Sequence, residues 1–359
     1  MTKKKYVLLE YARAICMLMI AYDHLGPLRK GDWWFSNLVR FLINRPLKMI
    51  DDFGALGVSI FFLLTGFFSL SSETSHAYIK KKIHKIVIPY LQSILAFYLF
   101  QRALSGVFHY NTYWTQFSSR DWLETTFLVN WFVGKPNPIN GVVWFMCPLL
   151  LWYLLIAGVK ALLHNQHHRY DGYLLQGALV LTVALQKLLH YTQFAFTPYI
   201  FMPVCGYVIR LRKEKLISFK ATILQLGLCY LNLVVSFYML DHGHYEANPY
   251  IISFMYALAI FGVLVWYESD KTLPVPPAAI GFLSGISYSF YLVHCLYGAM
   301  AMSAVEGRLP FTLCFFIGML ISLLCAWLNQ RLADSVIRVF NGRLFSAATR
   351  HHDKKGERL

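Results

Sequence analysis

Glu10, Arg13 and His24 are ionisable residues of the first apolar stretch of the chain, residues 6–25, and their spacing places them on one side of a helix. At about 100° per residue, the step from Arg13 to His24 makes about three full turns and leaves about 20°. Glu10 lies about 60° from Arg13 on the same side. A charged side chain near the centre of a membrane helix costs roughly 2.5 to 3.5 kcal/mol on insertion scales. The three residues therefore call for a compensating interaction or a function.

An imidazole and a guanidinium on one helix face can transfer a proton and bind an anion, and acyl transfer to a hydroxyl group is one reaction that uses both. Such a reaction needs a base for the hydroxyl proton and groups that hold the activated acyl donor. His24 is the candidate general base, with a covalent acyl-histidine as the alternative. Arg13, paired with Glu10 at i,i+3, would orient the donor roughly 16 Å away from His24 along the axis, at about 1.5 Å per residue. The competing interpretation is a structural ion pair and an interfacial histidine.

The composition indicates a membrane protein rather than a soluble one. Of the 359 residues, 57% are hydrophobic and 14% are charged, against roughly 25% charged in an average soluble domain. We expect an all-α integral membrane protein with about ten transmembrane helices, because ten apolar stretches approach the roughly 20 residues needed to cross a bilayer. These stretches are 6–25, 53–70, 86–104, 142–162, 173–189, 198–209, 221–240, 249–267, 280–302 and 311–328.

The basic residues set the expected orientation. If the first helix starts in the cytoplasm, 22 of the 33 lysines and arginines fall on the cytoplasmic side, which places both termini there by the positive-inside rule. This explains the net charge of +15 better than nucleic-acid binding does, because the basic residues are clustered between apolar segments. We expect a multi-pass protein of the inner (plasma) membrane, with a transmembrane domain over 1–335 and a basic cytoplasmic tail over 336–359.

Five motifs follow one another along the chain. They are Glu10-Tyr-Ala-Arg13-Ala-Ile with His24 eleven places after the arginine, Gly57-Val-Ser-Ile-Phe-Phe-Leu-Leu-Thr65-Gly-Phe67, Lys80-Lys-Lys82-Ile-His-Lys85 before Pro89-Tyr90, Trp144-Phe-Met through Tyr153, and Ser287-Tyr-Ser-Phe-Tyr291-Leu-Val-His294. In this order they resemble the acyltransferase-3 family of membrane acyltransferases over about residues 6–330. The family usually has serine where this chain has Thr65, and arginines at the places of Lys82 and Lys85.

The resemblance implies an acyl-CoA-dependent O-acyltransferase, with acetyl-CoA as the expected donor and a hydroxyl of a carbohydrate or glycolipid as the acceptor. The modified molecule would be a cell-envelope or exported glycan. Lys82 and Lys85 are the candidate ligands of the donor's phosphates, because clustered positive charge at a helix start can bind polyanions. Lysine lacks the bidentate contacts of arginine, and a plain positive-inside role is the alternative for each.

Four residues are expected to line the substrate cavity. Ser287, Tyr291 and His294 fall within about 60° of one another on one helix, and Trp144 is assigned by resemblance alone. For His294 the competing interpretation is a hydrogen-bonded packing residue, and for Trp144 a core or interface residue.

The remaining expectations concern partners and the alternative function. No metal is expected, because His164, His167 and His168 stand in a loop without a supporting acid or cysteine. No nucleic acid is expected either, and a homo-oligomer is compatible with the sequence. The alternative from another class is a transporter or flippase of a lipid-linked saccharide, in which Glu10, Arg13 and His24 would form a substrate or proton path. Transporters often contain two related halves, and no internal repeat is visible in this sequence.

Overall fold

The computed structural model describes residues 6–49, 53–71, 73–106, 117–129, 137–164, 170–188, 197–240, 247–268, 274 and 276–356. Every named element in this part of the chain is a helix. An isolated β-bridge joins Glu306 and Leu309. The elements are α1 (Val7–Leu25), α2 (Trp34–Val39), η1 (Arg40–Asn44), α3 (Gly54–Phe67), α4 (Ser75–Gly106), α5 (Ser119–Thr126), η3 (Gly141–Phe145), α7 (Met146–Leu162), α8 (Asp171–Leu188), η4 (Thr197–Ile200), α9 (Phe201–Lys213), α10 (Phe219–Leu240), α11 (Ala247–Tyr267), α12 (Ala278–Val293), η5 (His294–Gly298), α13 (Ala299–Val305) and α14 (Phe311–Gly356).

Each predicted apolar stretch overlaps a helix, so the helical class is confirmed for the described residues. Six helical stretches among them are long and apolar enough to cross a membrane, and α3 is a shorter apolar helix. The six are Ser75–Ser105, Gly141–Leu162, Phe219–Leu240, Pro249–Tyr267, Ala278–Val305 and Phe311–Val339. The protein is therefore a multi-pass membrane protein. The count of about ten spans stays a prediction, as does the cytoplasmic location of both termini.

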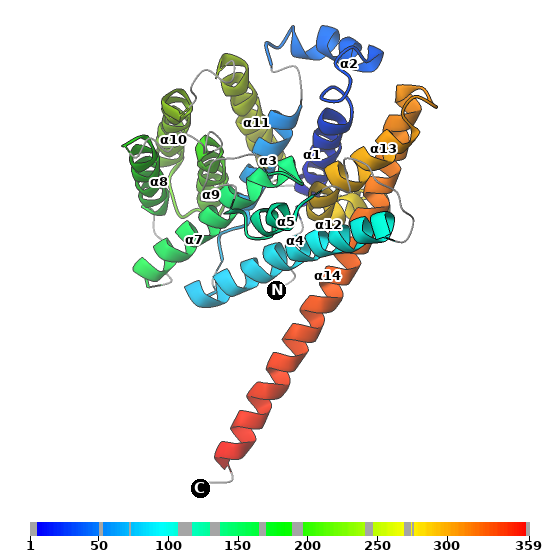
Figure 1. Cartoon of the computed structure of the whole chain (residues 1–359). Coiled ribbons are helices and arrows are strands. Elements are labelled where there is room, and N and C mark those ends of the chain that lie inside the picture. The colour runs from blue at the N-terminus through cyan, green and yellow to red at the C-terminus, as the bar shows by residue number, and fades with distance from the viewer. Residues whose placement is uncertain are drawn as a thin grey trace.

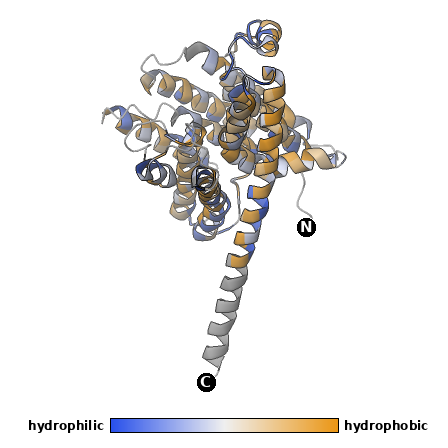
Figure 2. Ribbon diagram, turned by 45° about the vertical axis from the view of Figure 1, so that its right-hand side comes forward, coloured by the Kyte–Doolittle hydropathy of each residue, from blue (hydrophilic) through white to orange (hydrophobic). Residues whose placement is uncertain are grey.

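The outer surface of the bundle fits a lipid environment. Figure 2 shows apolar residues along most of the helices, and large apolar side chains such as Trp266 (74% exposed) and Leu320 (67%) lie on the outside. In a helical bundle that crosses a bilayer, lipid tails cover such side chains, and the backbone polar groups are satisfied within the helices.

Two helices are longer than the sequence predicts. The third predicted span starts at residue 86, but α4 begins at Ser75, so the lysine cluster lies on the helix instead of in a loop. Lysine is a good helix former, which explains this extension. The predicted domain boundary at residue 335 falls inside α14, which continues to Gly356 and projects from the bundle in Figure 1.

Helix α1 lies inside the bundle, where it packs against both α3 and α12. Helix α3 in turn packs closely on α9, because a methyl group at Gly66 would overlap the Pro203 carbonyl and one at Gly206 would overlap the Leu63 carbonyl. Such close approach at small residues is typical of membrane helix pairs. These contacts fix the position of the helix that carries Glu10, Arg13 and His24.

The start of α1 is held by groups from other helices. The Leu8 amide, in the first turn of α1, donates a hydrogen bond of 3.3 Å to Oε1 of Glu268, which directly follows α11. An acidic group at the N-terminus of α1 complements the dipole of that helix. Burial raises the pKa of Glu268, and the backbone N–H groups of α1 act in the opposite direction. Arg210 of α9 donates to the Tyr6 hydroxyl at 2.5 Å. The Arg13 end of α1 therefore lies near the basic end of α9.

Candidate functional site

A cationic cavity of about 420 Å³ lies between α1, α3, α4, α7, α12 and α14. Arg13 enters it from α1, and Lys82 and Lys85 enter it from α4. Asp334 of α14 also lines it. Three cations and one carboxylate leave the cavity with an excess of positive charge, which favours an anionic ligand.

Aromatic rings hold two of the cations. The Arg13 guanidinium lies 5.7 Å from the ring centre of Phe68, and Lys82 Nζ lies 4.8 Å from the ring centre of Tyr153. Cation–π contacts of this kind stabilise a cation whose water shell is incomplete. Lys85 is exposed, and it can therefore meet a ligand that enters from the aqueous phase.

Tyr291 supplies a polar group to the same cavity. Its side chain lines the cavity and is only 6% exposed, with its ring packed on Phe145 at a centroid distance of 4.0 Å. Among the described residues, the buried Tyr291 hydroxyl has no hydrogen-bond partner. A buried hydroxyl usually finds a partner, so a ligand oxygen in the cavity is a suitable acceptor for it.

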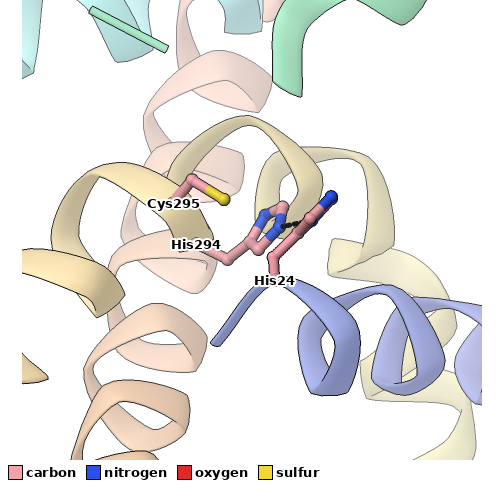
Figure 3. Close-up of side chains that lie close together, drawn as sticks. All are labelled: His24, His294 and Cys295. Atoms are coloured by element: carbon pink, nitrogen blue, oxygen red, sulfur yellow. Dashed lines mark hydrogen bonds between the residues drawn. The ribbon is translucent and has the colours of Figure 1, made fainter. Parts of the chain in front are cut away.

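A second cluster forms at the opposite end of α1, where His24 meets His294. Nδ1 of His24 lies 2.8 Å from Nε2 of His294, the contact drawn as a dashed line in Figure 3, and the two ring centroids are 5.1 Å apart with an interplanar angle of 25°. His294 is fully buried, and the side chain of His24 is 17% exposed. The second nitrogen of His24 points away from His294 in Figure 3. The pair thus offers one imidazole nitrogen for further chemistry.

The local fold explains the position of His294. The α-helical geometry of α12 ends at Val293, and η5 continues as a π-helical turn from His294. Asn140 donates its side-chain amide to the Leu292 carbonyl at 2.8 Å, next to this change of geometry. Single π-helical turns inside helices are frequent at functional sites.

Cys295 lies beside the histidine pair, and donor atoms of His24, His294 and Cys295 all fall within 4.8 Å of one another. Such a set could hold a metal ion. However, two nitrogens on one tetrahedral zinc, with Zn–N bonds of about 2.0–2.1 Å, would lie about 3.3 Å apart. The observed 2.8 Å is the distance of a direct hydrogen bond, so the geometry favours a hydrogen-bonded pair.

The predicted site residues fall into three groups. Arg13, Lys82, Lys85, Ser287 and Tyr291 line the cationic cavity. His24 and His294 do not line this cavity, and they form the histidine pair. Tyr291 connects the two clusters, because its side chain lines the cavity and its carbonyl oxygen lies 2.9 Å from Nδ1 of His294.

Glu10 and Trp144 take other positions. Glu10 is half-buried, and its charge acts on Arg13, in keeping with the expected i,i+3 attraction. Trp144 is half-buried and packs on Tyr199 at a centroid distance of 5.3 Å. Phe145, its neighbour in the sequence, lines the cavity instead. The role of Trp144 in substrate binding stays a prediction.

Sequence reasoning missed Asp23. It is buried, and its Oδ2 lies 3.9 Å from Nε2 of His24. The signal was available, because Asp23 is another ionisable residue in the same apolar helix and carries the same insertion cost. At this position its negative charge can stabilise an imidazolium at His24.

Comparisons with known proteins identify the family. The family model described as an acyltransferase domain matches residues 6–329, which is nearly the range of about 6–330 over which the sequence resembles that family. Comparison with curated proteins and with solved structures found no match.

Proposed function

The chain belongs to the acyltransferase-3 family, and on this basis we propose that it transfers an acyl group, expected to be acetyl, from acyl-CoA to a hydroxyl of a glycan or glycolipid. The observation that carries this proposal is the arrangement around Tyr291. On one side lies a cavity with three cations, and on the other lies a histidine with one ring nitrogen turned away from its partner. These are the groups that a polyanionic thioester and a hydroxyl acceptor would need.

The donor would occupy the cationic cavity. Lys82 and Lys85 hold the phosphates, and Arg13 neutralises charge deeper in the cavity. Arg13 and His24 are separated along α1 by roughly 16 Å, at about 1.5 Å per residue. The extended pantetheine arm of CoA can span such a separation, so the phosphates and the thioester can reach opposite ends of α1.

The reaction then follows the usual course of acyl transfer. His24 takes the proton of the acceptor hydroxyl as its oxygen bonds to the thioester carbon. The Tyr291 hydroxyl donates a hydrogen bond to the oxyanion that develops. When the carbon–sulfur bond breaks, the proton on His24 passes to the CoA thiolate. The products are the ester and free CoA, and His24 is neutral again.

We place the phosphate end of the cavity at the cytoplasmic face of the inner membrane. Lysines of α4 and basic residues of α9 gather at that end of the bundle, as the positive-inside rule favours. The acceptor would approach from the His24 end of α1. Oligomeric state plays no part in this mechanism.

Transfer of radiolabelled acetyl from acetyl-CoA to methyl glycosides, by purified protein in detergent micelles, tests the proposal. We expect label in the glycoside as an alkali-labile ester. Micelles have no compartments, so a transporter gives no labelled product. Replacing both Lys82 and Lys85 by methionine should raise KM for acetyl-CoA by roughly 10- to 100-fold, since charge-assisted hydrogen bonds contribute about 1.5–3 kcal/mol.

Two controls separate phosphate binding from general charge. S-acetyl-pantetheine carries no phosphate, so the Lys82/Lys85 double variant should use it as well as the wild type does. Lys80→Met with Lys81→Met removes the same charge from α4 outside the cavity lining and should leave KM near the wild-type value. The proposal would be wrong if correctly folded wild-type protein left the glycosides unlabelled. It would also be contradicted if the two double variants raised KM for acetyl-CoA equally.

A further inference from the structure

The ring of His294 is oriented by groups of its own helix. Its Nδ1 lies 3.1 Å from the carbonyl oxygen of Phe290 and 2.9 Å from that of Tyr291. The ring also stacks on Phe290 at a centroid distance of 5.5 Å and an interplanar angle of 6°. Both neighbours of Nδ1 are carbonyl oxygens, which only accept hydrogen bonds. Nδ1 of His294 must therefore carry a proton.

The tautomer of His24 follows from that of His294. A neutral imidazole with a proton on Nδ1 has a bare Nε2, which accepts a hydrogen bond. The atom 2.8 Å from this Nε2 is Nδ1 of His24, so Nδ1 of His24 must be the donor. In neutral His24 the proton is then on Nδ1, and the lone pair is on Nε2. In Figure 3 this Nε2 points away from His294.

We propose that His294 is a positioning residue that keeps His24 in the Nδ1-protonated tautomer, so that Nε2 of His24 is the atom that takes the proton of the acceptor hydroxyl. This inference rests on the proposed function and extends it, because it names the basic atom and the group that sets it. His294 itself touches neither the hydroxyl nor the thioester. It acts through a hydrogen bond, as the orienting carboxylate does in a serine-protease triad.

The hydrogen bond between the two histidines is compatible with each step. Before proton transfer, His24 donates from Nδ1 and has its lone pair on Nε2. After Nε2 has taken the hydroxyl proton, His24 carries two N–H groups, and Nδ1 still donates to His294. The proton leaves from Nε2 to the thiolate of CoA. No proton has to move between the two rings.

Asp23 is the other candidate for orienting His24, and its geometry does not suit that role. The distance from Oδ2 of Asp23 to Nε2 of His24 is 3.9 Å, which is too long for a hydrogen bond. This carboxylate oxygen also faces Nε2 of His24, the nitrogen whose lone pair must be free to take the hydroxyl proton. Asp23 can stabilise the protonated ring through its charge, but His294 makes the directional contact.

Two variants and one spectroscopic measurement test the assignment. His294→Leu removes the acceptor, and His294→Gln offers an amide oxygen to Nδ1 of His24. We expect His294→Leu to lower kcat about 10- to 100-fold, the range found when the hydrogen-bond partner of a metal-binding histidine is removed, with little change in KM. His294→Gln should recover most of this loss. Nitrogen-15 spectra of histidine-labelled protein in nanodiscs, assigned with His24→Gln, should show a protonated Nδ1 and a bare Nε2 on His24.

The spectra distinguish a positioning role from a structural one. In His294→Leu we expect the Nε2-protonated tautomer of His24 to gain population. A wild-type spectrum with the proton on Nε2, or a tautomer that His294→Leu does not change, would overturn the inference. If His294→Leu does not fold, the spectra of the wild type and of His294→Gln still show which nitrogen of His24 carries the proton. A protonated Nδ1 on His24 without acyl transfer by the wild type would refute the proposed function and leave the tautomer assignment intact.

Discussion

Replacing His24 by alanine is expected to lower kcat for acyl transfer by about 10²- to 10⁴-fold, the range that a positioned general base contributes. Alanine removes the nitrogen that takes the hydroxyl proton and leaves His294 buried without its partner. The measurement is the initial rate of label transfer from acetyl-CoA at saturating donor. KM for the donor should change little, because His24 lies outside the lining of the cationic cavity.

The matched control for this prediction is His76→Ala. His76 is exposed in the first turn of α4 and lies outside both clusters, so its removal should leave kcat unchanged. Monodisperse elution of both variants in detergent would show that the fold is intact. A folded His24→Ala protein with wild-type turnover would exclude His24 as the base.

Replacing Tyr291 by phenylalanine is expected to lower kcat by about 10²- to 10³-fold, as the loss of one oxyanion donor does in other enzymes. The substitution removes only a hydroxyl group, and the ring that packs on Phe145 is retained. Among the described residues this hydroxyl has no protein partner to lose, so the free energy of unfolding should fall by less than about 1 kcal/mol. Label transfer and thermal unfolding together measure the two effects.

Tyr98→Phe provides the comparison for the tyrosine prediction. Tyr98 lies on α4 with its ring against Trp122, outside the cavity lining, and the phenylalanine ring preserves that contact. This variant should keep full activity. If Tyr291→Phe also kept full activity, the oxyanion would have to find its donor elsewhere, and the role given to the Tyr291 hydroxyl would be wrong.

The sequence predicts the parts of the site that depend on local geometry. Helical periodicity alone relates Glu10, Arg13 and His24, because an α-helix turns by nearly the same angle at each residue. It also relates Ser287, Tyr291 and His294 within one span. The motifs predict the family, and the family comparison confirms it.

The contacts between distant segments could not be predicted in this way. His24 and His294 are 270 positions apart, and neither periodicity nor composition indicates that their rings meet. The π-helical turn that begins at His294 depends on packing and has no simple sequence signal. Trp144 shows the same limitation, because a shift of one residue decides whether Trp144 or Phe145 faces the cavity.

The helices themselves are confirmed for the described residues, whereas the number of spans stays a prediction. Helix α9 has 13 residues and ends in Arg210, Arg212 and Lys213, and α1 carries ionisable groups along its length. Hydropathy and length alone do not qualify such helices as spans. Their polar groups find partners within the bundle, which is where membrane proteins usually place intramembrane charge.

The most direct test of the central claim is a cryo-electron microscopy structure of the protein with a non-hydrolysable acetyl-CoA analogue. The claim is that the cationic cavity and the histidine pair are two ends of one site. We predict density for the CoA phosphates beside Lys82 and Lys85, and the acetyl group beside Tyr291 within reach of Nε2 of His24. An analogue bound outside the cavity, or one whose acetyl group lies far from His24, would contradict the account.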